Sequence, residues 1–193
     1  MEHIEKSIVV EAPLSMVYNQ WTQFEEFPEF MDGVESVRQL DDKRLHWRAK
    51  IAGKIKEWDA EIFDQTPDQR IAWRSISGAM NTGQVRFESL GENQTRVYLK
   101  LNYDPEGAVE NIGDALGLVS SKIEGDLQRF KQFIESRGAE TGAWRGEIHG
   151  RHVQGDQSAE ARSKRLLQED TSAVGGSIRP KLRNSSGKSS QPM

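Results

Sequence analysis

The sequence predicts an α+β domain in which a curved antiparallel sheet of about six or seven strands wraps around one long C-terminal helix, with two short helices after the first strand. Two observations support this fold class. Between Gly33 and Tyr103, apolar and polar residues alternate in short runs separated by turn residues, as in antiparallel strands with one wet face. Beyond Gly107, apolar residues recur at steps of three and four, as in an amphipathic helix.

The N-terminal part is expected to form one strand and two short helices. Residues 3–11 alternate apolar and polar side chains and therefore suit a strand. Pro13 then lies near the first turn of a short helix that includes Trp21. A second short helix is expected after Thr22, because four apolar residues recur there at helical spacing around Pro28. These residues are Phe24, Phe27, Phe30 and Met31.

Two independent features agree on the register of the central hairpin. A turn after Ile51 places Trp58 opposite Trp47. The same register places Glu57 opposite Arg48, so apolar residues meet on one face and opposite charges meet on the other. One face of the sheet therefore collects large aromatic surface.

Further hairpins are expected to continue this pattern. The next strand adds Trp73 to the face that already holds the other two indoles. A turn at residues 78–80 is then expected to place Trp73 near Val85 and Ile71 near Phe87, because this turn length keeps the apolar face continuous. The result is a sheet of simple antiparallel hairpins.

The long helix is expected to run from Val109 to about Ser136 and to end at Gly138. Its apolar stripe would cover the indole face of the sheet, and a sheet and helix with indoles between them can hold an apolar molecule. The glycines inside the helix allow two readings, either simple tolerance with close packing or space for a ligand. The stripe consists of Val109, Ile112, Leu116, Val119, Ile123, Leu127, Phe130 and Ile134.

Composition excludes several classes of function. Residues 1–137 carry 17 Lys and Arg against 24 Asp and Glu, a net charge of −7, which argues against a nucleic-acid groove. The absence of cysteine excludes disulfides, thiol nucleophiles and thiolate metal sites. The chain has no apolar run of about 18 residues and no signal-peptide core, so we expect a soluble, cytoplasmic protein without a transmembrane segment.

Residues 138–193 are expected to form a mostly disordered polar tail after a ligand-binding domain at residues 1–137. This tail has few clustered apolar side chains to offset a backbone entropy cost of about 1–2 kcal/mol for each ordered residue. Trp144 is the exception, because it could dock back onto the domain. The basic stretch from Arg145 onward suggests an alternative function, an interaction module that contacts an acidic partner or, transiently, a membrane surface.

Several strings in the sequence resemble a known family. EWDAEI, IAWRSISG, TRVYLKLNYDPEG and GDALG…KIEGDLQRFKQFIESR are similar to the polyketide cyclase/dehydrase group of the SRPBCC (START/Bet v 1-like) superfamily, which also contains coenzyme Q-binding START-like proteins. The likeness covers residues from about 4 to 137. It implies the helix-grip fold and an internal cavity for a lipid, an isoprenoid quinone or a polyketide-like aromatic. Members include both carriers and enzymes, so the fold does not determine the activity.

The residues themselves predict no catalytic set, metal site or cofactor site. His149 and His152 have a spacing that suits metal ligands, but one pair without further ligands is a weak signal. Glu57, Asp59 and Glu61 alternate on one strand, and strand periodicity places them on the face opposite the tryptophans. We therefore interpret these carboxylates as solvated charges.

Two serines, Ser75 and Ser77, are expected to share the face of Trp73. Their hydroxyls suit either a carbonyl or quinone oxygen of a ligand, or a local bond to backbone or water. An enzymatic alternative is a cyclase or dehydrase that acts on a poly-β-ketone chain. In that case these serines, Tyr103 and Arg38 would assist enolisation.

The main hypothesis is a non-catalytic carrier or sensor of an apolar small molecule. It depends on the aromatic face, the amphipathic helix and the family resemblance. Any single aromatic ring, taken alone, suits a solid core better than a ligand contact. The residues expected to line the ligand cavity are Trp47, Trp58, Trp73, Ser75, Phe87, Leu99, Leu101, Leu116, Val119, Ile123, Phe27 and Phe30.

Overall fold

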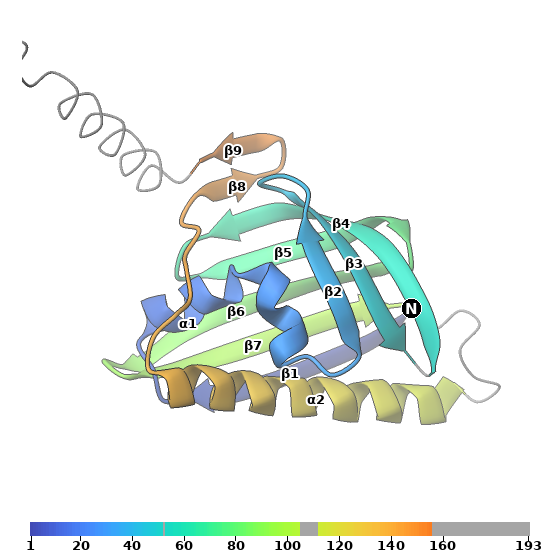
Figure 1. Ribbon diagram of the computed structural model, residues 1–193, viewed down its shortest axis with the longest axis horizontal. Helices are drawn as coiled ribbons and strands as arrows, with labels where there is room; N and C mark the ends of the chain where they lie inside the picture. Colours follow the sequence, from blue (N-terminus) through green and yellow to red (C-terminus); the bar gives the residue numbers. More distant parts are fainter. Residues whose placement is uncertain (52, 105–111, 156–193) are drawn as a thin grey trace, which may run out of the picture. The chain divides into compact units, whose positions relative to one another are not determined.

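The computed structural model describes residues 1–51, 53–104 and 112–155, with only the backbone described for residues 112–116. A large antiparallel sheet arches over one long helix, as Figure 1 shows, so the predicted α+β helix-grip class is confirmed. The elements are β1 (Glu2–Val10), α1 (Leu14–Trp21), the 3-10 helix η1 (Phe24–Glu29), β2 (Val34–Gln39), β3 (Arg44–Ile51), β4 (Lys54–Thr66), β5 (Arg70–Gly78), β6 (Asn81–Gly91), β7 (Gln94–Tyr103), α2 (Ile112–Arg137), β8 (Glu147–His149) and β9 (His152–Gln154).

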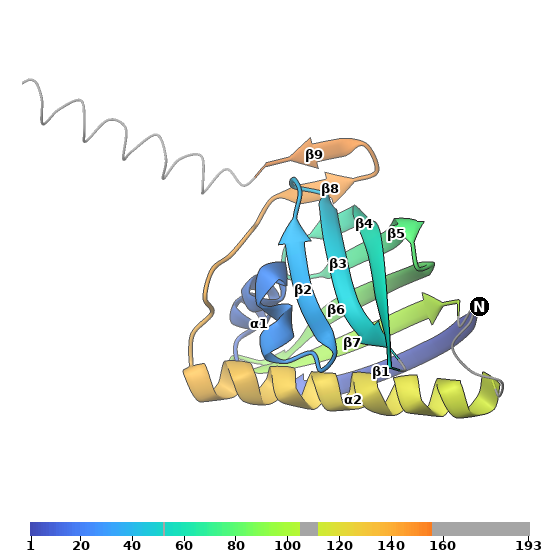
Figure 2. The ribbon, with the colours of Figure 1, turned by 45° about the vertical axis from the view of Figure 1, so that its right-hand side comes forward.

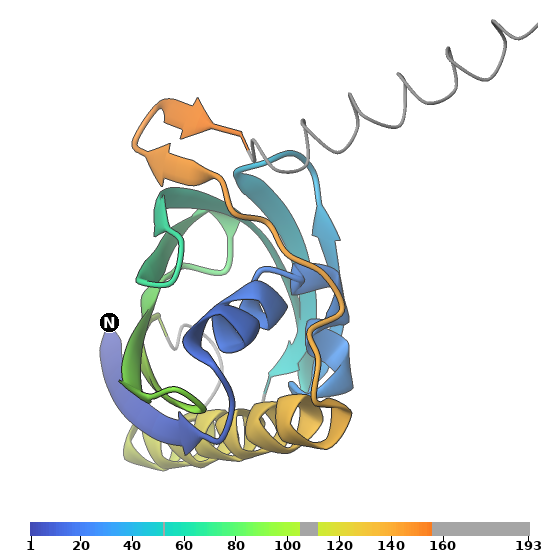
Figure 3. The same cartoon turned by 90° about the vertical axis from the view of Figure 1, so that its left-hand side faces the viewer.

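The main sheet has the order β1-β7-β6-β5-β4-β3-β2, and neighbouring strands are antiparallel. The strands β1 and β2 form its two edges and do not pair with each other. Figures 2 and 3 show that the sheet curls and that α2 lies along the open side between these edges. The helix therefore covers the concave face, where the apolar residues lie.

Several polar contacts hold α2 against the rest of the domain, and three of them come from residues 129–135. The Lys131 ammonium donates to the carbonyl oxygen of Val9 on β1 at 2.7 Å. The Glu135 carboxylate accepts a hydrogen bond from the backbone N–H of Glu11, also at 2.7 Å. Arg129 donates to the carbonyl oxygen of Phe30 at 3.0 Å, which links the helix to the segment before β2. The helix ends at Arg137 and is followed, as predicted, by Gly138, whose positive φ of 66° suits glycine. Its predicted start at residue 109 lies outside the described residues.

The helices α1 and η1 close one end of the hollow. Pro13 occupies the N-cap position of α1, next to the first turn as predicted, and α1 ends before Thr22. The second helix is a 3-10 helix that includes Pro28. The ring of Trp21 packs edge-on against Phe27, with centroids 5.6 Å apart, and against Phe130 of α2 at 4.9 Å. These aromatic contacts fill the space between the short helices and α2.

The predicted register is confirmed in the β3–β4 hairpin and wrong in the β5–β6 hairpin. Trp58 lies opposite Trp47, and Glu57 lies opposite Arg48. Between β5 and β6, however, Trp73 pairs with Gly83, which is two residues away from the predicted partner Val85. A shift by two residues keeps every side chain on the same face, so the hydrophobic pattern did not distinguish the two registers.

Residues 138–155 pack against the domain, so the predicted domain boundary at residue 137 falls short of the ordered part. The strand β8 pairs with the end of β4, and Ile148 on β8 is fully buried in the core. Trp144 packs against the core as expected, and its backbone N–H donates to the Thr22 hydroxyl at 3.0 Å. The two terminal guanidinium nitrogens of Arg145, Nη2 and Nη1, donate to the Asp68 carboxylate at 2.6 and 3.1 Å. Disorder in residues 156–193 stays a prediction, because these residues lie outside the described ones.

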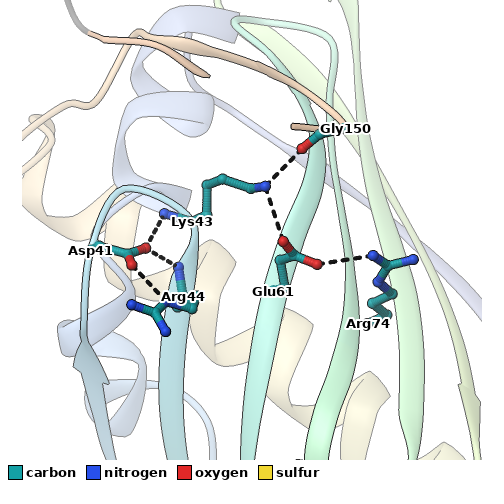
Figure 4. Close-up of polar contacts among 6 residues, drawn as sticks. All are labelled: Asp41, Lys43, Arg44, Glu61, Arg74 and Gly150. Carbon is teal, nitrogen blue, oxygen red and sulfur yellow. Dashed lines mark hydrogen bonds and ion pairs between the residues drawn. The ribbon is translucent and has the colours of Figure 1, made fainter. Parts of the chain in front are cut away.

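Ion pairs cross the convex face of the sheet, where the sequence predicted solvated charges. Figure 4 shows Glu61 between Lys43 at 3.0 Å and Arg74 at 3.0 Å. Hydrogen bonds from these two side chains hold the pKa of Glu61 below its usual value. Lys43 also donates to the carbonyl oxygen of Gly150 at 2.7 Å, so the turn before β3 is linked to the turn between β8 and β9. Glu61 on β4 is therefore linked to β5 and to the turn before β3.

The packing of β8 makes a testable prediction. Ile148→Ala should lower the free energy of unfolding by about 2–4 kcal/mol, because it leaves a cavity in the core. Val153→Ala is the control, since Val153 is 38% exposed on the neighbouring strand β9. It should cost less than about 0.5 kcal/mol. Urea denaturation followed by circular dichroism measures both values, and equal small effects would mean that β8 is not part of the folded unit.

Candidate ligand-binding cavity

A cavity of about 510 Å³ lies between the concave face of the sheet and α2. Its size falls within the range of about 300–1,000 Å³ that is usual for small-molecule pockets. Aromatic and aliphatic side chains from the strands, from α1 and η1 and from α2 form most of its wall. The cavity is therefore suited to an apolar ligand.

Strand periodicity explains which side chains reach the wall. Successive side chains of a strand point to opposite faces, so every second residue faces the hollow. On β3, the residues that line the cavity by this rule are Leu45, Trp47, Ala49 and Ile51. On β4, they are Lys56, Trp58, Ala60 and Ile62.

Three tryptophans form a large part of the sheet-side wall. The rings of Trp47 and Trp58 are stacked, with centroids 5.7 Å apart and planes only 6° from parallel. The ring of Phe27 meets Trp47 edge-on at 5.7 Å. The ring of Trp73 lies directly over Gly83, where a Cβ atom would collide with it. Glycine at this position lets the indole lie close to the sheet.

Eight of the predicted residues lie on the cavity wall, and three others do not. The residues on the wall are Trp47, Trp58, Trp73, Leu99, Leu101, Val119, Ile123 and Phe27. Ser75, Phe87 and Phe30 are buried in the domain but are not on the wall. The side chain of Leu116 lies outside the described residues. That any of these residues contacts a ligand stays a prediction.

The two serines do not share one face of the sheet as the sequence suggested. The Ser75 hydroxyl accepts a hydrogen bond from the backbone N–H of Asn81 at 3.0 Å. The Ser77 hydroxyl donates to the Asp59 carboxylate at 3.0 Å, on the convex face. The reason is a register shift between β4 and β5, which leaves Ile76 without a partner and turns Ser77 outward. The hydroxyl of Ser75 is therefore used within the fold.

The polar residues of the wall were not singled out by the sequence analysis, apart from Tyr103. Lys56 lies two residues before Trp58 on β4, so strand alternation alone places it on the side that faces the cavity. On α2, Lys122 and Asp126 lie one turn apart beside the apolar stripe. Burial raises the pKa of Asp126, although hydrogen bonds from the backbone N–H of Asp32 and from Arg129 oppose this shift.

One end of the cavity is bordered by exposed residues. Leu118 of α2 is 67% exposed and Met80, which follows β5, is 50% exposed, yet both line the cavity. The end of β3 and the beginning of β4 lie at the same border, through Lys50, Ile51 and Lys56. The opposite end is closed by the aromatic side chains of α1, η1 and α2. The cavity therefore has a closed apolar end and a more polar mouth.

Comparison with protein families and with individual proteins agrees with this geometry. A model of the family described as polyketide cyclase/dehydrase and lipid transport matches residues 10–132. An uncharacterised 17.2 kDa protein from the melC2-rnhH intergenic region of Streptomyces lincolnensis is 48% identical over 149 residues, which are 77% of this chain and 99% of that protein.

Solved structures show the same fold. The protein DR_A0006 of Deinococcus radiodurans is 28% identical, with a TM-score of 0.56, over 71% of this chain and 99% of its own. The Zhui aromatase/cyclase of Streptomyces sp. R1128 is 18% identical, with a TM-score of 0.59, over 74% and 98% of the two chains. A START superfamily protein of Mycobacterium smegmatis is 14% identical, with a TM-score of 0.56, over 70% and 95%. The last two likenesses concern the fold alone.

The contact between Trp73 and Gly83 can be tested by substitution. Gly83→Ala should lower the free energy of unfolding by about 1–3 kcal/mol, because the new methyl group displaces the indole. Gly91→Ala, in the same strand, is the control, since no atom lies within 4 Å of the position of its Cβ. It should change stability by less than about 0.5 kcal/mol. Equal urea midpoints for the two variants would show that the indole does not lie on Gly83.

Proposed function

We propose that this chain, which belongs to the polyketide cyclase/dehydrase and lipid transport family, binds and carries a hydrophobic small molecule between its sheet and α2. The observation that carries the proposal is the cavity of about 510 Å³ with four indoles on its wall, three from the sheet and one from α1. A lipid, an isoprenoid quinone or a polyketide-like aromatic would suit such a wall. The resemblance to the polyketide cyclase/dehydrase group is confirmed by the family match. The Zhui aromatase/cyclase and the START superfamily protein share the fold.

Burial of apolar surface provides the driving force for binding. A ligand that buries about 300 Å² of apolar surface would gain roughly 7 kcal/mol at about 25 cal/mol per Å². Part of this gain is lost when the ligand gives up its free motion, so a ligand that binds in the micromolar range must bury a larger apolar area than this. The stacked and edge-on rings hold the wall in place, which limits the cost of reorganisation on binding.

A cyclase or dehydrase remains the alternative, because the same cavity would fold a poly-β-ketone chain. The four polar residues considered for that chemistry do not converge, however. Tyr103 lines the cavity, whereas Ser75 does not reach the wall and Ser77 faces outward. Arg38 is exposed on β2 and pairs with His46, which binds Asp59 on the convex face. The geometry therefore favours binding over catalysis by these residues.

The proposal extends to a transient contact between the mouth of the cavity and a lipid surface. The tip formed by β3 and β4 combines lysines with isoleucines and has no acidic residue between Lys50 and Lys56. Ile55 in this tip is 43% exposed, and Leu118 at the same mouth is exposed too. Exposed apolar residues among lysines favour anionic lipid headgroups. In the part of the chain that the structure describes, no helix has the length and apolarity needed to cross a bilayer, so the contact would be peripheral.

The interaction-module alternative depends on the basic stretch from Arg145 onward. Arg145 itself binds Asp68 and also donates to the side chain of Asn19 at 2.8 Å, so it belongs to the folded domain. The remaining basic residues of the stretch lie mainly beyond residue 155, outside the described residues. Binding of an acidic partner by this stretch therefore stays a prediction.

The carrier function can be tested by filling the cavity. Leu101→Trp should weaken binding of the fluorescent apolar probe N-phenyl-1-naphthylamine about tenfold, because the larger ring occupies the ligand space. Leu90→Trp adds the same ring at an exposed position outside the cavity and should leave binding unchanged. The delipidated wild-type protein should also show a higher melting temperature with fatty acids, quinones or fused-ring aromatics. Failure of the probe and of every compound in this panel to bind would refute the proposal.

The lipid contact is tested by cosedimentation with vesicles of phosphatidylcholine and phosphatidylglycerol. Ile55→Ser should reduce the bound fraction about fivefold, since the tip loses an apolar side chain that enters the interface. Leu90→Ser is the matched control, because Leu90 is 37% exposed but lies away from the mouth. Equal losses for both variants, or no binding of the wild type, would contradict a contact through this tip.

A further inference from the structure

Tyr103 occupies a special place on the cavity wall. On β7, the residues that face the concave side alternate with those on the convex side, and Leu99, Leu101 and Tyr103 all line the cavity. Tyr103 is the last residue of the strand and pairs with Asn81 on β6 and Glu2 on β1. The series of apolar inward residues therefore ends in a phenol near the mouth.

The hydroxyl of Tyr103 has no hydrogen-bond partner among the described residues, although it is sealed from solvent. Leaving a buried hydroxyl unpaired destabilises a protein, because the group has lost its hydrogen bonds to water. Two other buried polar atoms of the described residues also have no partner, Gln65 Oε1 and Thr66 Oγ1. Neither of these residues lines the cavity. Tyr103 is thus the unpaired group that borders the ligand space.

Other polar side chains of the wall have partners within the protein. Asp126 binds Arg129 and the backbone N–H of Asp32. The side-chain amide of Asn81 donates to the carbonyl oxygen of Ala79 at 3.1 Å. Burial raises the pKa of Tyr103, which keeps the phenol protonated and able to donate at neutral pH. The Tyr103 hydroxyl is therefore an unused hydrogen-bond donor directly beside the cavity.

We propose that Tyr103 is the polar anchor of the cavity and that the ligand is an apolar molecule with a hydrogen-bond-accepting oxygen, such as a ketone carbonyl. The inference rests on the proposed function, since it concerns the same cavity. The ligand oxygen accepts the phenol proton near the mouth, where a small shift of the side chains around the hydroxyl admits it. The apolar body extends toward the closed end, where Trp21 and Phe130 lie.

The test compares two rigid probes of nearly equal shape, 9-fluorenone and fluorene, which differ by a carbonyl in place of a methylene group. Displacement of N-phenyl-1-naphthylamine gives the affinity of each probe for the full chain. The wild type should bind fluorenone about fivefold more tightly than fluorene, as expected for one net hydrogen bond. Tyr103→Phe should lose this preference and keep its affinity for fluorene.

Tyr98→Phe is the matched control, because the Tyr98 hydroxyl donates to Glu88 at 2.9 Å on the convex face. This variant should keep the preference for fluorenone. In the ligand-free state, Tyr103→Phe should melt at the same temperature as the wild type or higher, since it removes an unpaired hydroxyl. A lower melting temperature would mean that the hydroxyl is bonded within the protein, and it would overturn the inference.

The outcomes also separate this inference from the proposed function. If both probes bind the wild type equally well, the anchor role of Tyr103 is wrong and the carrier function stands. If neither probe binds, both the inference and the proposed binding of compact apolar molecules fail. Loss of binding of both probes in Tyr103→Phe would assign the residue a general packing role and would contradict a role as a polar anchor.

Discussion

The hollow in this domain depends on how α2 meets the sheet. Toward its C-terminal end, Phe130 and Ile134 are fully buried, and polar bonds from Lys131 and Glu135 hold this end to the chain at β1. Toward the mouth, the side chains of the helix border open space instead. One helix is too narrow to fill a sheet that curls so widely, and α1 and η1 fill the remaining space at one end only. The cavity is the space between the concave face and α2 that no side chain fills.

The sequence predicted most of this arrangement, because the relevant signals are periodic. Alternation along the strands placed Trp47, Trp58 and Trp73 on one face, and their position on the cavity wall follows from the same rule. The charge pair of Arg48 and Glu57 supported the register of the central hairpin. Helical spacing likewise predicted the stripe of α2 that faces the sheet. These features require only local patterns and a known period.

The features that the sequence did not predict depend on single local contacts. In the β5–β6 hairpin, the indole of Trp73 fits over Gly83, and the hydrophobic pattern of the sequence does not encode this fit. The outward direction of Ser77 follows from one extra residue in β5. Residues 138–155 looked too polar to fold, yet Ile148 and the ion pair of Arg145 with Asp68 hold them in place. A few well-placed contacts are enough to order a short segment on an existing surface.

The pairing of β8 with β4 has a consequence for the behaviour of the protein at high concentration. The strand β4 is longer than β3, which pairs with it only as far as Glu61. Beyond that point, backbone groups of β4 would be left open to another chain, and exposed strand edges of this kind promote aggregation. The strand β8 covers them by pairing with Asp64 and Gln65. By pairing with this end of β4, β8 covers backbone groups that would otherwise be open to a strand of another molecule.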